Sequence, residues 1–236
     1  MTRALVLRAR EDAARTAEKL RAMGIEPVLS PVLEIAATNA PIPPGDYDAV
    51  LVSSAKGVEC APASAQAFQT LPLHAVGAKT AAVARAQGWR TDIVAGSAEA
   101  ILPLLVLRYT SPVKMLYLAG RDRQPTLEAG LRAAGHAITA VNVYEARAVE
   151  TLTDDARAAI ADGSIDLALH YSRRSVEIFL RLVEGCGLTP RLGDIAHAAL
   201  SEDVAAPLRA IGLNPVVAKK PDEAALLEAA NELRIT

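Results

Sequence analysis

Aromatic side chains are scarce in this chain of 236 residues, where Phe, Trp and Tyr together make up 3% of the sequence. So few rings argue against the stacking platform on which single-stranded nucleic acids are bound. The charge balance points the same way, because 25 Lys and Arg residues are offset by 27 Asp and Glu residues, leaving a net charge of −2. Nucleic-acid-binding surfaces usually carry an excess of positive charge. The composition therefore predicts no nucleic-acid partner.

Cysteine and histidine are too few and too scattered for a metal centre. The two cysteines, Cys60 and Cys186, lie in unrelated contexts, and the four histidines occupy four different segments. Neither set has the close spacing of zinc or redox motifs. We expect no metal, and two reduced thiols in a cytoplasmic protein.

Long apolar runs are missing as well. No stretch approaches the roughly 18 to 20 apolar residues that a membrane-spanning helix needs. Residues 4–7 already resemble a strand, with no charged and then apolar leader before them. We expect no signal peptide and no membrane partner, and a monomer is the default oligomeric state.

Motifs for common cofactors and nucleophiles are also absent. No GxGxxG follows Leu7 or Leu118, and no GxxxxGK[ST] occurs in the chain. Ser53 and Ser54 lack the GxSxG elbow of serine hydrolases. The sequence thus predicts no cofactor and gives no support to a serine nucleophile.

The chain contains two copies of a strand that leads directly into a helix. Residues 47–58 read as a buried strand that ends at Ser53-Ser54, and residues 164–176 repeat the plan with Ser172 in the place of Ser54. Continuous apolar runs of this kind are typical of central strands in parallel sheets. A repeat of this size indicates duplicated supersecondary units.

Two further units are duplicated. Residues 74–88 and 198–212 both read as a short strand, a turn and a helix that ends at glycine, and residues 4–24 correspond in the same way to 115–135. Glycine at a helix end supplies the left-handed cap. Alternation of strands and helices indicates an α/β fold with parallel sheets.

The order of the units predicts two similar doubly wound parallel-sheet domains, of which the first is discontinuous in sequence. Residues 1–34 and 148–236 form domain 1, and residues 38–142 form domain 2. Residues 32–37 and 143–147 form a two-stranded hinge. An arrangement of domains strictly in sequence would leave the N-terminal βαβ unit as a small separate piece, so the interrupted arrangement is favoured.

The predicted carboxyl ends of the strands carry small hydroxyl residues and bases. These are Arg8, Arg10, Ser53, Ser54, Lys56, Lys79, Thr80, Arg121, Arg123, Ser172, Arg173, Arg174 and Ser201. Ligands bind at this edge of open α/β sheets, and helix N-termini there favour anions. A facing pair of such edges would form a cleft for a large polyanion with several carboxylates. Taken singly, each residue is better explained as a helix cap or a solvated surface base, and only the collection favours the cleft.

Tyr144 breaks the duplication, because its counterpart is Leu33. A phenol at the predicted hinge could donate a proton or a hydrogen bond to a leaving hydroxyl. It could equally be an amphipathic residue that covers the hinge.

Together these segments resemble the uroporphyrinogen-III synthase family over essentially the full length. The matching motifs are Tyr47-Asp48 leading to Ser53-Ser54-Ala55, residues 76–81 with Gly88, residues 116–121, Val143-Tyr144-Glu145, Tyr171-Ser172 and Ala199-Leu200-Ser201. Many relatives have Thr-Arg-Pro after the first strand, whereas this chain reads Leu7-Arg8-Ala9, so the arginine carries over and the proline does not.

The resemblance implies two α/β domains on a flexible β-ladder that bind linear hydroxymethylbilane, a polycarboxylate, with no cofactor and no metal. It implies that Tyr144 assists departure of the hydroxyl group as water. Ser54, Thr80, Ser172 and Ser201, with neighbouring amides, would hold acetate and propionate groups, and Arg8 and Arg121 would contribute charge. The flanking positions Ser53, Ala55, Lys79, Gly120 and Arg173 are assigned to the same binding site.

Two other functions remain open from the sequence. A non-catalytic cytosolic two-domain sensor of small molecules would share the same architecture. An enzyme that uses an NTP or a sugar nucleotide is disfavoured by the missing phosphate loops.

Overall fold

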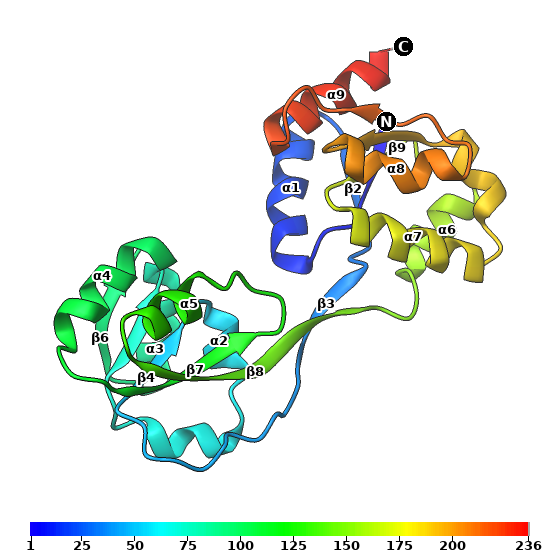
Figure 1. Ribbon diagram of the computed structural model, residues 1–236. Coiled ribbons are helices and arrows are strands. Elements are labelled where there is room, and N and C mark those ends of the chain that lie inside the picture. Colours follow the sequence, from blue (N-terminus) through cyan, green and yellow to red (C-terminus); the bar gives the residue numbers. More distant parts are fainter. Residues whose placement is uncertain (236) are drawn as a thin grey trace. The chain divides into compact units, whose positions relative to one another are not determined.

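The computed structural model describes residues 1–235, and the chain forms two compact units (Figure 1). Unit 1 contains Met1–Glu34 together with the segment from Arg147 onward, and unit 2 contains Ile35–Ala146. The chain therefore leaves unit 1, builds the whole of unit 2, and returns.

Unit 1 is built on a five-stranded parallel sheet with the strand order β11-β10-β9-β1-β2. In chain order its strands are β1 (Arg3–Val6), β2 (Glu26–Leu29), β9 (Leu167–His170), β10 (Ala196–Ala199) and β11 (Val216–Val217). The chain pairs β1 with β2 on one side and with β9 on the other. The order in which strands are added reverses between β1 and β9, so this pair is the topological switch point of the sheet.

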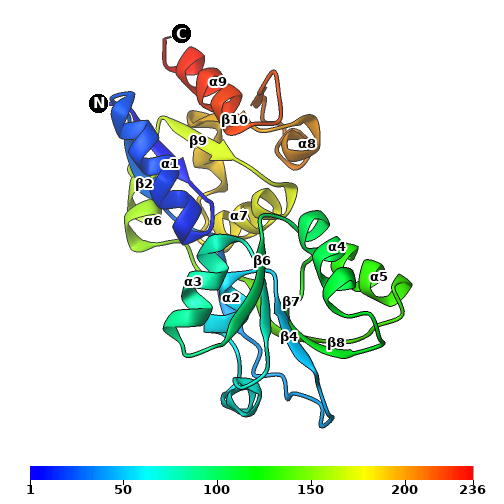
Figure 2. The same ribbon diagram turned by 90° about the vertical axis from the view of Figure 1, so that its left-hand side faces the viewer.

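Helices cover both faces of this sheet (Figure 2). Ala4 and Val6 pack with the helices of one face, whereas Leu5 and Leu7 pack with those of the other, as the alternation of a strand requires. The first face carries α1 (Arg10–Ala22) and α9 (Glu223–Ile235), and the second carries α6 (Asp154–Ala161), α7 (Arg173–Gly185), the 3-10 helix η2 (Thr189–Asp194) and α8 (Glu202–Ala210).

Unit 2 has a six-stranded sheet with the order β3-β8-β7-β4-β5-β6. Its strands are β3 (Leu33–Ala37), β4 (Ala49–Val52), β5 (Leu73–Val76), β6 (Thr91–Ala95), β7 (Lys114–Gly120) and β8 (Ala137–Ala148). One face packs on α2 (Ala55–Glu59), the 3-10 helix η1 (Ala63–Phe68) and α3 (Ala78–Ala86), and the other packs on α4 (Ala98–Arg108) and α5 (Thr126–Ala133).

The two sheets have the same plan. If β7 and β8 are matched to β1 and β2, and β4, β5 and β6 to β9, β10 and β11, the strand orders coincide. The predicted α/β class with two similar doubly wound parallel sheets is therefore confirmed. The predicted glycine caps are confirmed as well, since Gly88 and Gly212 follow their helices with φ of +86° and +87°.

The second crossing between the units is formed by the end of a long strand. Residues 143–146 belong to the continuous 12-residue strand β8. In the first crossing β2 and β3 are separate strands. β3 lies beside β8 in the sheet, so the chain passes between the units along two neighbouring strands.

Gly57 allows α2 to lie unusually close to the sheet. A Cβ atom at this position would be 2.5 Å from the carbonyl oxygen of Leu118 in β7. Because that oxygen belongs to the backbone, it cannot rotate away. We therefore expect Gly57→Ala to lower the free energy of unfolding by about 1–3 kcal/mol, the usual cost of overpacking, as measured by urea denaturation.

Gly185→Ala is the matched control. Gly185 also lies in a helix, and a Cβ atom there would have no neighbour within 4 Å. Alanine favours a helix over glycine, so this variant should be as stable as the parent or more so. Equal stability of the Gly57 and Gly185 variants would contradict the close approach of α2 to β7.

In the described part of the chain, no helix combines the length and the hydropathy that crossing a bilayer requires.

Candidate active site

Most of the predicted site residues lie at or just after the carboxyl ends of strands in both units, and Tyr144 lies within β8. In unit 1 they lie after β1 and β9, and in unit 2 after β7 and β4, which are the switch points of the two sheets. A second group follows the neighbouring strands β5 and β10. Open α/β sheets bind their ligands at such edges.

In unit 2, β4 ends at two serines with different partners. The Ser54 side chain caps α2 by accepting a hydrogen bond from the Lys56 amide at 3.3 Å, and Ala55 is the first residue of that helix. The Ser53 hydroxyl instead lies 2.5 Å from the hydroxyl of Tyr117, which comes from β7. Burial raises the pKa of Tyr117, so its phenol stays protonated at neutral pH. This end of β4 therefore holds one hydroxyl as a cap and another in a phenol–hydroxyl pair.

Tyr144 reaches the same edge from β8. Its ring lies against Gly120, the last residue of β7, where a Cβ atom would come within 2.6 Å of the ring carbon Cζ and 2.7 Å of the hydroxyl oxygen. The Arg121 amide donates a hydrogen bond to the Tyr144 carbonyl at 2.9 Å. The absence of a side chain at Gly120 thus provides the space for the phenol.

A shift in strand register directs this ring. Ala119 pairs with Asn142, but the next residue, Gly120, pairs with Tyr144, so Val143 is an extra residue on β8. Val143 and Tyr144 consequently pack into the same hydrophobic cluster, although successive residues of a regular strand point to opposite faces. Bulges of this kind re-aim side chains and are common beside active sites.

Arg123 holds the turn that follows β7. Its guanidinium donates to the Gly120 carbonyl at 2.7 Å, to Asn142 Oδ1 at 2.6 Å and to Glu128 at 2.6 Å. It also lies over the Tyr117 ring, 5.6 Å from the centroid. The sequence showed Arg123 only as one of several bases, and it gave Tyr117 no role. Arg123 thus fixes the Gly120 carbonyl against β8, and Tyr117 lies under its guanidinium.

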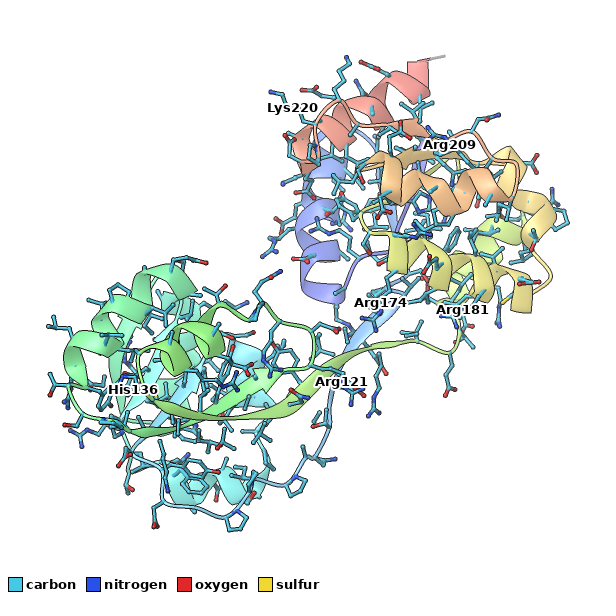
Figure 3. The ribbon with its side chains drawn as sticks, viewed as in Figure 1. Arg121, His136, Arg174, Arg181, Arg209 and Lys220 are labelled. Atoms are coloured by element: carbon cyan, nitrogen blue, oxygen red, sulfur yellow. The ribbon has the colours of Figure 1, made fainter. Side chains whose placement is uncertain are left out.

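Arg121, labelled in Figure 3, is more exposed than Arg123. It forms an ion pair with Glu145. Its side chain is 61% exposed, whereas that of Glu145 is 11% exposed. The guanidinium is therefore tethered at one side and open to solvent at the other. It could meet an anionic ligand without breaking a buried contact.

If Arg121 binds an anionic group of the substrate, Arg121→Ala should raise the KM for that substrate by about two- to fivefold, the range of an exposed ion pair. The kcat should change little. An interaction made equally in the ground state and the transition state has this effect. Steady-state kinetics would measure it. Arg108→Ala is the matched control. Arg108 is the last residue of α4, is 55% exposed, and pairs with Asp92 in β6. A lower kcat with unchanged KM would contradict a simple binding role.

In unit 1, the equivalent edge carries Arg8 after β1 and Tyr171-Ser172 after β9. The Arg8 guanidinium lies 4.1 Å from the centroid of the Tyr171 ring and pairs with Glu223 at 2.9 Å. Ser172 caps α7 by accepting a hydrogen bond from the Ser175 amide at 3.1 Å. Arg173 is exposed and pairs with Glu177 and Asp203.

The remaining predicted residues follow β5 and β10. Lys79 is exposed and Thr80 is buried, both in the first turn of α3. Ser201 caps α8 by accepting a hydrogen bond from the Val204 amide at 3.4 Å. The acids that follow it are neutralised within unit 1, because Glu202 pairs with Arg209 and Asp203 with Arg173.

The structure also joins two histidines that the sequence keeps apart. His170 on β9 and His197 on β10 lie 3.0 Å apart, Nε2 to Nδ1. Because His197 Nε2 donates to the Leu192 carbonyl at 3.0 Å, its Nδ1 must accept the proton of His170. Burial lowers the pKa of both rings, and the neighbouring His197 lowers that of His170 further. They form a neutral pair in the core.

Among the side chains that the structure describes, no group of three His, Cys, Asp or Glu is suited to a metal ion. The cysteines Cys60 and Cys186 are both unbonded thiols. Two surface pockets, one beside β2 and α6 and one beside β9 and β10, contain none of the predicted site residues. The strand ends are the candidate site because they bring the predicted residues together at the switch points of the two sheets.

Comparison with known proteins gives consistent results. The family model described as uroporphyrinogen-III synthase HemD matches residues 14–228. A uroporphyrinogen-III synthase of Synechococcus elongatus is 27% identical in an alignment 219 positions long, and the alignment covers 83% of this chain and 81% of that protein.

Two crystal structures show the same fold. Uroporphyrinogen-III synthetase from Helicobacter pylori 26695 superposes with a TM-score of 0.57 at 18% identity, covering 99% of this chain and 100% of that one. A mutant uroporphyrinogen III synthase from the extremely thermophilic bacterium Thermus thermophilus gives a TM-score of 0.50 at 18% identity, covering 100% of this chain and 99% of that one.

Proposed function

Because the chain belongs to the uroporphyrinogen-III synthase family, we propose that it converts linear hydroxymethylbilane into uroporphyrinogen III. The reaction removes one water and closes the ring, so the enzyme would be a lyase of tetrapyrrole biosynthesis. The match of the family model to residues 14–228 is the observation that carries this proposal.

In the proposed reaction, the hydroxyl of the hydroxymethyl group on ring A takes up a proton and leaves as water. The pyrrole nitrogen supplies the electron pair, which gives an electrophilic azafulvene. The substituted carbon of ring D attacks this centre to form a spiro intermediate. The intermediate then fragments and recloses with ring D inverted.

Tyr144 is proposed to protonate the leaving hydroxyl, or to donate a hydrogen bond to it. Its phenol lies over Gly120 at the end of β7, and the hydroxyls of Ser53 and Tyr117 pair at the neighbouring end of β4. This supports a role at the ligand-binding edge. A fixed phenol would contribute through positioning and a directed dipole, which need no strong base.

The acetate and propionate groups of the substrate are proposed to bind along the strand ends. Exposed Arg121 and Arg173, together with the amides at the starts of α7 and α8, offer positive charge and N–H donors for carboxylates. Ser54, Ser172 and Ser201 would act mainly through the amides beside them, because their side-chain oxygens already accept hydrogen bonds as caps.

The test is to supply hydroxymethylbilane, generated enzymatically in the same vessel, and to separate the oxidised porphyrin isomers. A type-III porphyrin supports the proposal. Formation of only the spontaneous type-I ring would overturn it and leave a protein that binds without catalysis.

A further inference from the structure

The carboxylate of Glu223 occupies a complete set of hydrogen-bond donors at the switch point of unit 1. Its Oε1 accepts from Arg8 Nη1 at 2.9 Å, from Thr16 Oγ1 at 2.7 Å and from the Tyr171 hydroxyl at 3.2 Å. Its Oε2 accepts from Lys19 Nζ. Two cations and two hydroxyls thus converge on one carboxylate. We call these four residues the carboxylate cradle.

The cradle has contacts of its own that do not depend on Glu223. Arg8 stacks on the Tyr171 ring, 4.1 Å from its centroid, and donates to Thr16 at 3.2 Å. Thr16 is fully buried in α1. Arg8 also pairs with Asp12 at 3.5 Å, and its attraction to the aromatic face adds to these contacts. Arg8, Thr16 and Tyr171 would therefore stay in place if the carboxylate left.

Glu223 comes from a different part of the chain and has room to move. It is the first residue of α9, and its side chain is 23% exposed. The start of α9 is capped separately by Asp222, which accepts a hydrogen bond from the Ala225 amide at 2.9 Å. Burial opposes the charge of Glu223, but Lys19, Thr16 and Arg8 outweigh it and lower its pKa. An ionised side chain at the edge of the cradle can rotate into solvent without breaking the helix cap.

The contact of Glu223 with the cradle has no equivalent at the corresponding position of unit 2. The counterpart of Glu223 in unit 2 is Glu99, which also lies in the first turn of its helix. Glu99 is exposed, and its pKa is lowered by its own backbone amide and by Ser97. Only in unit 1, among the described residues of these two helices, does the acid bind across the switch point.

We propose that the cradle is a binding site for a carboxylate group of the substrate, and that Glu223 fills it as an internal stand-in until a substrate carboxylate displaces it. The identity of the ligand rests on the proposed function. On displacement the Glu223 carboxylate moves into water and the incoming carboxylate takes over its four donors. Because the cradle is then open only part of the time, the observed affinity is lower than the intrinsic affinity by the open fraction.

The test compares Glu223→Ala with Glu99→Ala, which removes the duplicate acid away from the cradle. Loss of the internal competitor should lower KM for hydroxymethylbilane, and the dissociation constant for uroporphyrin, by about three- to tenfold. Glu99→Ala should change neither. Glu223→Gln keeps the size of the side chain and should shift both in the same direction by less.

Propionate provides a readout that needs no activity. It has the chemistry of the removed side chain, so calorimetric titration should show that it binds Glu223→Ala but not the parent protein. Propionamide should not bind, and Glu223→Ala combined with Arg8→Ala should lose propionate binding. The proposal that the cradle binds a substrate carboxylate would be overturned by either of two results for Glu223→Ala. One is a KM and a uroporphyrin dissociation constant that are unchanged or higher, and the other is no binding of propionate.

The two proposals can fail separately. If propionate binds as expected but no type-III porphyrin is formed, the cradle stands and the synthase proposal fails. If type-III porphyrin is formed but the Glu223 variants behave like the parent, the synthase proposal stands and the displacement fails.

Discussion

Replacing Tyr144 by phenylalanine is expected to slow turnover by about ten- to a thousandfold, within or just below the range of general-acid effects. The ring would keep its place against Gly120, and only the hydroxyl would be lost. KM should change little, because the proposed hydrogen bond is made to the leaving oxygen as it departs. Single-turnover kinetics on hydroxymethylbilane would measure the effect on the chemical step.

Tyr47→Phe is the control for that experiment. Its hydroxyl also makes one hydrogen bond, to the Pro43 carbonyl at 2.9 Å, but away from the carboxyl ends of the strands. Its removal should leave turnover unchanged. If Tyr144→Phe turns over at the parent rate, Tyr144 is a structural residue of β8 and the proton comes from another group or from water.

Gly120→Ala should reduce turnover as strongly as Tyr144→Phe, while costing little stability. The new Cβ atom would lie 2.6 Å from the Tyr144 ring carbon Cζ, which is closer than two non-bonded carbon atoms can approach. Since the atoms in its way belong to the outer end of a side chain, the ring can rotate aside, and the phenol then leaves its position. Turnover should therefore fall by about ten- to a thousandfold, the same range as for loss of the hydroxyl.

Thermal denaturation and turnover would be measured together for this variant. Gly96→Ala serves as the control, because a Cβ atom at Gly96 has no neighbour within 4 Å and both properties should be retained. Full activity in Gly120→Ala would show that the exact place of the Tyr144 ring does not matter. A large loss of stability would show instead that the ring cannot yield.

The repeated strand ends could be predicted because they depend on local sequence. Ser54 and Ser172 cap their helices as the hydroxyl-ended strands suggested. The α/β class followed from alternating apolar runs and glycine caps, which are short-range signals. The same patterns placed most of the candidate residues at the ends of strands but could not decide which of them touch.

The contacts that define the site depend on strand pairing, which local patterns do not specify. The extra residue Val143 in β8 turns Tyr144 toward Gly120. The pattern of apolar and polar residues in 137–148 does not predict this bulge. The contact of Glu223 with Arg8 joins the two ends of the chain. The predicted facing of the two sheet edges stays a prediction, since it depends on backbone angles at the crossings.

The discontinuity of unit 1 has a consequence for the folding of the chain while it is being translated. β1 pairs with β9, with Ala4 opposite Leu167, so the centre of this sheet joins segments from near the start and the last third of the chain. Unit 2 is uninterrupted, so we expect it to fold once residue 146 has emerged from the ribosome. Until β9 is made, the edge of β1 that pairs with β9 stays uncovered, and an uncovered strand edge favours aggregation.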